Sequence, residues 1–349
     1  MNRTLTTVAA LILFSNSACH GQRYDNVDTD SETCCASDSA TTSDSATASD
    51  EDAPGLTPPY NIILVGWDGV QRDHFMACFK STLADCPDGL PAIASLSGGR
   101  IFDIVVTTAA TETKPGWVEN LTGYDDAALS VLSDSVFGPI PAGYSIFEKA
   151  EHHFGDANIA TIFLAGKQAN LGADCTTTPA QPWCEVAPKL DLFENGIGDT
   201  PEVGKRALEV LSEYKDQKFL AFVHFPQPDL RGHANGENSP QYSEGLVEAD
   251  QWLARINDRL IELNIAKQTL IYVISDHGFD EDAKTHHDAP FTVLASNDDT
   301  IVRNGDRKDV APTVLKKLGV SLGEMDGVPA VDGRPLDSLQ GGRVVEDAN

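Results

Sequence analysis

The chain has few basic residues. Its 349 residues include 25 Lys and Arg but 53 Asp and Glu, which gives a formal net charge of -28 at pH 7. Proteins that bind nucleic acid need basic patches to neutralise phosphates, so this balance argues against a nucleic-acid groove. We therefore expect bound cations, rather than Lys and Arg, to hold any small anionic substrate.

Long apolar runs are also absent. The apolar run at residues 8–14 is too short to span a bilayer. It follows Arg3 and precedes the small residues before Cys19, so residues 1–18 have the pattern of an export signal. Two outcomes remain open for an envelope or secreted protein: simple cleavage, or a bacterial lipoprotein signal in which lipidated Cys19 is the membrane contact.

The C-x-x-C spacing of structural zinc sites does not occur. The chain has seven cysteines, an odd number, and assigning Cys19 as a lipid anchor leaves six. Cys78 lies close to Cys86 in the sequence, and Cys175 lies close to Cys184. We predict that both pairs form disulfides in an oxidising compartment.

Residues 19–58 are rich in Asp, Ser, Thr and Ala and contain almost nothing that a core could bury. This composition predicts a disordered acidic tether. The length and composition of the remainder predict one domain at residues 59–340, without internal repeats, and a short tail at residues 341–349.

Apolar runs within this domain predict an α/β fold. We expect strands at residues 61–66, 101–106, 159–164, 219–225, 269–275 and 291–295, and helices at residues 201–215, 241–263 and 309–318. Continuous apolar strands are typical of a parallel sheet that helices cover on both faces.

Polar side chains follow these strands, at the edge of the sheet where ligands bind in open α/β folds. They are Asp68, Thr113, Asp229 with His233, Asp276 with His277, and then His286 or His287. Carboxylate oxygens and imidazole nitrogens together suit zinc or a similar divalent ion. Three Asp, three His and one hydroxyl are enough for two metal sites with open positions.

Several of these residues also have simpler explanations. Asp68 precedes Gly69, as in many turns, and Thr113 precedes Pro115, as in many helix N-caps. The functional alternative for Thr113 is a nucleophile at the positive end of a helix. We expect Asp229 and His233 to lie on a loop, where Gly232 allows a tight turn.

Taken together, the segments resemble the alkaline phosphatase superfamily, nearest its type I phosphodiesterase/nucleotide pyrophosphatase and sulfatase-like branch. The matching segments are residues 67–69, 111–117, 122–123, 229–233, 275–278, 309–313 and 332–334, in the order found in the family. The resemblance covers nearly everything from residue 60 to residue 338. It implies a three-layer α/β/α sandwich with a mostly parallel central sheet.

The resemblance also implies a role for each residue. One metal ion would be held by Asp229, His233 and a late histidine, for which we choose His286 over His287, and the other by Asp68, Asp276 and His277. Thr113 would reach both ions and act as the nucleophile that forms a phospho-enzyme. The implied cofactors are two divalent metal ions, which we expect to be Zn²⁺.

Two departures from the family bear on the substrate. Residues 113–117 lack the Cys or Ser and the Arg of formylglycine sulfatases, which argues against that mechanism. Many phosphodiesterases carry an Asn after the nucleophile helix, and the nearest counterpart here is Asp134, which repels a phosphoryl oxygen unless it is protonated or bound to a metal. Lys114 could line the substrate pocket instead of lying in solvent.

Three functions are therefore compared. The first is a metal-dependent phosphodiesterase or phosphomonoesterase. The second is a hydrolase of another ester or of a phosphonate at the same site. The third is a surface-displayed binding protein that has lost catalysis, although no ligand or nucleophile is missing from the pattern.

Overall fold

One mixed sheet of eight strands organises the part of the chain that the structure describes. The structure is a computed structural model, and it describes residues 56–106, 111–176 and 181–338. The predicted export signal, Cys19, nearly all of the tether and the tail lie outside these residues. The described residues belong to one compact unit.

The strands are β1 (Asn61–Trp67), β2 (Phe102–Val105), β3 (Ala160–Ala165), β4 (Leu192–Glu194), β5 (Phe219–Phe225), β6 (Thr269–Ile274), β7 (Phe291–Ser296) and β8 (Gly305–Asp306). Their order in the sheet is β4-β3-β5-β1-β6-β7-β2-β8. All six predicted strands are present. The edge strands β4 and β8 were missed because they are too short for a recognisable pattern.

The direction of the strands decides which loops meet. Among the described strands, β7 alone runs antiparallel to its neighbours β6 and β2, and the other pairs are parallel. The carboxyl ends of the seven remaining strands therefore share one edge. The amino end of β7 lies at that edge too, so the loop between β6 and β7 begins and ends there.

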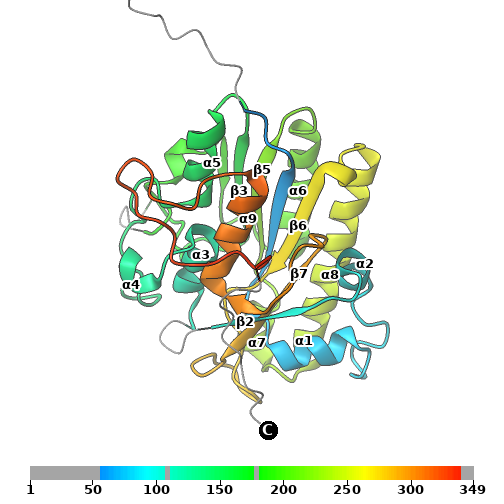
Figure 1. Cartoon of the computed structure of the whole chain (residues 1–349). Helices are drawn as coiled ribbons and strands as arrows, with labels where there is room; N and C mark the ends of the chain where they lie inside the picture. Colours follow the sequence, from blue (N-terminus) through cyan, green and yellow to red (C-terminus); the bar gives the residue numbers. More distant parts are fainter. Residues whose placement is uncertain (1–55, 107–110, 177–180, 339–349) are drawn as a thin grey trace, which may run out of the picture. The chain divides into compact units, whose positions relative to one another are not determined.

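Helices cover both faces of the sheet. They are α1 (Arg72–Phe79), α2 (Pro91–Ser97), α3 (Thr113–Thr122), α4 (Asp126–Leu129), α5 (Ile146–Phe154), α6 (Thr200–Glu213), α7 (Asp229–Asn235), α8 (Pro240–Glu262) and α9 (Val310–Leu318). Single 3₁₀ turns are η1 (Ala187–Lys189), η2 (Ala266–Gln268) and η3 (Arg307–Asp309). Figure 1 shows α3, α5 and α9 on one face, and α1, α2, α6 and α8 on the other.

Alternate side chains of the central strand point into two separate cores. Ile62 and Leu64 of β1 pack with α3, α5 and α9, whereas Ile63 and Val65 pack with α1, α2, α6 and α8. This alternation explains why β1 is apolar at nearly every position: both of its faces are buried. The expected three-layer α/β/α fold with a mostly parallel sheet is confirmed.

The predicted disulfides agree with the sequence analysis. Both predicted disulfides, Cys78–Cys86 and Cys175–Cys184, are formed. Among the described residues, no helix combines the length and the apolarity needed to cross a bilayer.

Candidate metal centre and nucleophile

Three aspartates meet at the carboxyl edge of the central strands. Asp68 follows β1, Asp229 begins α7 just after β5, and Asp276 follows β6. Because β1 lies between β5 and β6, the three loops are neighbours, and hydrogen bonds connect them. The N–H of Asp229 donates to the carbonyl of Asp68 (2.9 Å), and the N–H of Gly69 donates to Oδ1 of Asp276 (3.0 Å).

Asp68, Asp276 and His277 form one group of candidate metal ligands, which we call the Asp276 group. All three side chains are fully buried. Nε2 of His277 lies 3.4 Å from Oδ2 of Asp276 and 3.6 Å from Oδ1 of Asp68. Oδ2 of Asp276 accepts no hydrogen bond within the described residues, which leaves a buried carboxylate oxygen free for a cation.

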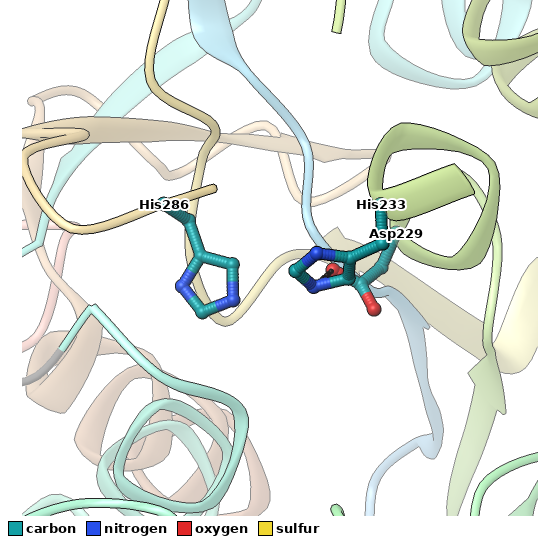
Figure 2. Close-up of side chains that lie close together, drawn as sticks. All are labelled: Asp229, His233 and His286. Carbon is teal, nitrogen blue, oxygen red and sulfur yellow. Dashed lines mark ion pairs between the residues drawn. The ribbon is translucent and has the colours of Figure 1, made fainter. Parts of the chain in front are cut away.

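Asp229, His233 and His286 form a second group, which we call the Asp229 group. In Figure 2, His233 from α7 and His286 from the β6–β7 loop lie on opposite sides of a gap, with Asp229 beside His233. Nε2 of His233 lies 3.3 Å from Oδ1 of Asp229. Oδ1 of Asp229 and Nδ1 of His286 are buried and have no hydrogen-bond partner within the described residues.

Backbone carbonyls fix the orientation of two imidazoles. Nδ1–H of His233 donates to the carbonyl of Lys284 (2.8 Å), and Nδ1–H of His277 donates to the carbonyl of Gly278 (2.9 Å). A carbonyl can only accept, so Nδ1 of each ring carries a proton, and in the neutral ring Nε2 has the lone pair for a metal ion.

The two groups are adjacent. Nε2 of His277 lies 3.9 Å from Oδ1 of Asp229, and the rings of His277 and His286 stack with their centroids 4.0 Å apart. The seven expected site residues therefore include six potential metal ligands in two neighbouring groups of three.

The structure corrects the expected loop around Asp229 and His233. Both residues lie on helix α7, so their spacing of four places them on one face of a helix. Gly232 has a role other than turning the chain. A Cβ atom at Gly232 would lie 2.6 Å from the ring of Phe279, so the glycine allows α7 to approach that ring closely.

Thr113 is the first residue of α3, and the N-cap is Glu112. The helix N-cap explanation for Thr113 is therefore wrong. Its hydroxyl oxygen lies 3.3 Å from Nε2 of His277, and its side chain is buried. The start of α3 comes this close because residue 116 is glycine: a Cβ there would lie 2.6 Å from the carbonyl oxygen of Asp276.

Lys114 and Asp134 contact each other beside Thr113. The N–H of Lys114 donates to Oδ1 of Asp134 (2.9 Å), and Nζ of Lys114 donates to the carbonyl of Asp134 (2.9 Å). Lys114 is buried, so it does not lie in solvent. Burial raises the pKa of Asp134, although the hydrogen bond from Lys114 and its charge oppose the shift.

Sequence reasoning missed Lys167 and His224. Nζ of Lys167 lies 2.8 Å from Oδ1 of Asp68 and 2.5 Å from Oδ2 of Asp229, and Nε2 of His224 lies 2.7 Å from Oδ2 of Asp68. Lys167 follows β3 at the same edge of the sheet, so the rule that selected Asp68 could have selected it. His224 was detectable as an imidazole inside the otherwise apolar strand β5.

The carboxylates differ in their electrostatic surroundings. Burial pushes the pKa of Asp68 and of Asp229 upward. The Lys167 ammonium, together with His224 beside Asp68 and with His233 and His277 beside Asp229, outweighs burial and holds both pKa values below the usual range. Burial and the negative charge of Asp68 raise the pKa of Asp276 well above its usual range. Burial, with His277 close by, lowers the pKa of His286 to about 4, so His286 is neutral at pH 7.

Two curated relatives are similar to the chain. The GPI ethanolamine phosphate transferase 1 of Aspergillus oryzae is 24% identical over 83% of this chain and 29% of its own length. A 2,3-bisphosphoglycerate-independent phosphoglycerate mutase of Wolbachia pipientis is 31% identical over 49% of this chain and 33% of its own length. The chain thus spans about a third of the length of these relatives.

Two solved structures share the fold. The phosphonate monoester hydrolase SpPMH from Silicibacter pomeroyi is 14% identical, with a TM-score of 0.54 over 79% of this chain and 76% of its own. The lipoteichoic acid synthase LtaP from Listeria monocytogenes is 14% identical, with a TM-score of 0.52 over 81% of this chain and 76% of its own.

These relatives are too distant to assign the chain to a family, but a family model does assign it. The model of type I phosphodiesterase/nucleotide pyrophosphatase matches residues 140–318, which include Asp229, Asp276 and His286. Asp68 and Thr113 lie before the matched segment, and the fold brings them to the same site. Because the match covers more than half of the sequence, the chain belongs to the type I phosphodiesterase/nucleotide pyrophosphatase family.

Proposed function

We propose that this protein hydrolyses phosphate esters, phosphodiesters in particular, with Thr113 as the nucleophile and two divalent metal ions as cofactors. One observation supports the proposal most strongly: the Thr113 hydroxyl lies 3.3 Å from Nε2 of His277, beside two groups of three candidate metal ligands. A buried hydroxyl in this position differs from a helix-capping one, because it faces ligands from other strands.

The residues present fit divalent ions. Each group offers carboxylate oxygen and imidazole nitrogen, the combination that catalytic zinc sites use, and each contains a buried carboxylate oxygen without a hydrogen bond among the described residues. Zinc ions bound there would neutralise the anionic ester and lower the pKa of the Thr113 hydroxyl.

The reaction would proceed in two displacements. In the first, Oγ of Thr113 gives up its proton and attacks phosphorus, the bond to the leaving alcohol breaks, and the alcohol departs with a proton. In the second, water attacks phosphorus, the bond to Oγ breaks, and Thr113 regains a proton. The α3 backbone fixes Thr113 in line with the ligand groups, because Gly116 allows the helix to lie against Asp276.

Asp134 supports a preference for diesters. Its Oδ1 already accepts the N–H of Lys114, at the start of α3, where a phosphoryl oxygen would otherwise be held. An ionised carboxylate in this position repels negative charge. A phosphodiester carries one negative charge and a phosphomonoester carries up to two, so the repulsion is weaker for the diester.

Thr113→Ala tests the covalent step. We expect turnover of p-nitrophenyl phosphodiesters to fall by roughly 10³-fold or more, because the nucleophile is lost while the metal ligands remain. Zinc content by mass spectrometry should stay at the wild-type value. Thr122→Ala, at the other end of the same helix, is the matched control and should keep both turnover and zinc.

A panel of ester substrates distinguishes this function from the two alternatives, a hydrolase of other esters and a binding protein. We would assay mono- and diesters, a phosphonate monoester and a sulfate ester, with and without a chelator. Chelator-sensitive turnover of diesters supports the proposal, and chelator-resistant turnover contradicts the role of the metal ions. A zinc-loaded protein with no turnover on any ester would instead favour a binding protein.

A further inference from the structure

Lys167 lies between the two ligand groups rather than at the rim of the site. Its Nζ contacts one carboxylate of each group, Asp68 and Asp229, and its side chain is buried. Three buried carboxylates meet here, counting Asp276, and uncompensated buried charges are strongly unfavourable. In the metal-free protein, the Lys167 ammonium therefore supplies positive charge that the metal ions supply when they are bound.

The contacts of Lys167 affect the two groups unequally. Both carboxylate oxygens of Asp68 are engaged, Oδ1 by Lys167 and Oδ2 by His224. In Asp229, Lys167 contacts only Oδ2, and Oδ1 faces His233 without a hydrogen bond among the described residues. At the Asp276 group, Asp68 offers a metal ion only oxygens that Lys167 or His224 already contacts, and among the described residues the free oxygen is Oδ2 of Asp276. At the Asp229 group, the single carboxylate keeps its own Oδ1 free.

We propose that Lys167 is a resident cation that compensates the carboxylates before metal binding, weakens metal binding at the Asp276 group and so makes the Asp229 group fill first. The inference rests on the proposed two-metal site. The inference adds the order in which the two metal sites fill. It attributes that order to Lys167, a side chain that binds no metal itself.

Zinc titration of the metal-free protein tests this order. By calorimetry, the wild type should bind one ion tightly and a second more weakly. In Lys167→Met the weaker step should tighten at least roughly tenfold, because a unit charge next to the Asp68 oxygen is removed. In Lys167→Arg, which keeps the charge, the two unequal steps should remain.

Thermal unfolding gives a second readout. Lys167→Met should unfold at a lower temperature than the wild type without metal, and the difference should shrink when zinc is in excess. Lys149→Met is the matched control, because Lys149 is also buried but lies 5.4 Å from the Tyr124 ring instead of on a carboxylate. Its destabilisation should be the same with and without zinc, and both zinc affinities should be unchanged.

The outcomes also distinguish this inference from the proposed function. Weaker or unchanged zinc binding in Lys167→Met would overturn the inference, as would a variant that stays unfolded in excess zinc. A variant that folds only with zinc would support it. A wild type that binds no zinc at all would instead refute the two-metal function on which the inference rests.

Discussion

His286 and His287 are adjacent in the sequence, but their side chains lie in different surroundings. The His286 ring stacks on His277 and belongs to the Asp229 group, whereas His287 is exposed. Since burial keeps His286 neutral at pH 7, one of its two ring nitrogens has a lone pair for a metal ion. The structure thus groups His286, which the sequence analysis chose over His287, with Asp229 and His233, and its role as the late ligand stays a prediction.

Replacing each histidine separately tests this assignment. We expect His286→Ala to reduce the zinc content from two ions per chain to one and to reduce diester turnover by about 10²-fold, because a direct metal ligand is lost. His287→Ala is the control and should keep both ions. The opposite pattern in metal analysis would show that His287 is the ligand.

The contact between α3 and the loop after β6 depends on a glycine. At Gly116, a Cβ atom would lie 2.6 Å from both the carbonyl oxygen and the Cβ of Asp276. Neither side can yield by a side-chain rotation, because the clash involves the backbone. A larger residue at this position must therefore separate α3, which carries the proposed nucleophile Thr113, from the Asp276 group.

Gly116→Ala should consequently lower turnover by about 10²-fold, the usual effect of a displacement near 1 Å in a catalytic geometry. Zinc affinity at the weaker site should fall with it, as measured by titration. Gly138→Ala, where no atom lies within 4 Å of the added Cβ, is the matched control. Equal activity of both variants would contradict the importance of this contact.

A buried carboxylate joins α8 to α2 on the other face of the sheet. Oδ1 of Asp250 accepts the N–H of Ile93 (2.8 Å), and Oδ2 accepts the N–H of Ala92 (3.0 Å). These are unpaired donors in the first turn of α2, so Asp250 caps a helix from a distance. Burial raises the pKa of Asp250 to about 6, against an ordinary value of 3.8.

This shift predicts a pH-dependent stability. Between about pH 6 and pH 4 the folded protein holds a proton on Asp250 that the unfolded chain has released, so this group's contribution rises as the pH falls. Relative to Asp250→Asn, the wild type should gain up to about 3 kcal/mol from pH 7 to pH 4. Urea unfolding at each pH measures the difference, and Asp258→Asn, exposed on the same helix, controls for the loss of one acid.

At the scale of the whole molecule, the candidate ligands come from four separate segments. They follow β1, begin α7, follow β6 and precede β7. Metal ions that bind only when these segments are assembled must stabilise the folded state by mass action. The metal sites are therefore expected to contribute to stability as well as to chemistry.

Chelation should reveal that contribution. At a free zinc concentration 1,000 times the dissociation constant, each site adds about 4 kcal/mol to the free energy of unfolding. We expect a chelator to lower the melting temperature and excess zinc to restore it, as followed by calorimetry. The same chelator saturated with zinc is the control, and a melting temperature independent of zinc would contradict the coupling.

Local patterns were sufficient to predict much of this molecule. Strands β1, β5 and β6 could be recognised from the sequence, because a strand that is buried on both faces must be apolar at successive positions. Asp68 and Asp276 follow such strands directly, so the edge of the sheet on which they lie was predictable as well.

Contacts between distant segments were decided only by the tertiary structure. Lys167 and Asp68 are 99 residues apart, and no local pattern indicates that an ammonium lies between two carboxylates. His286 lies at the site because β7 runs antiparallel to β6, so that the loop between these strands begins and ends at the edge where the other ligands lie. The sequence determined which residues could bind metal, because residue type and strand position are local properties. Their grouping was decided by strand pairing, because pairing joins residues that the chain keeps far apart.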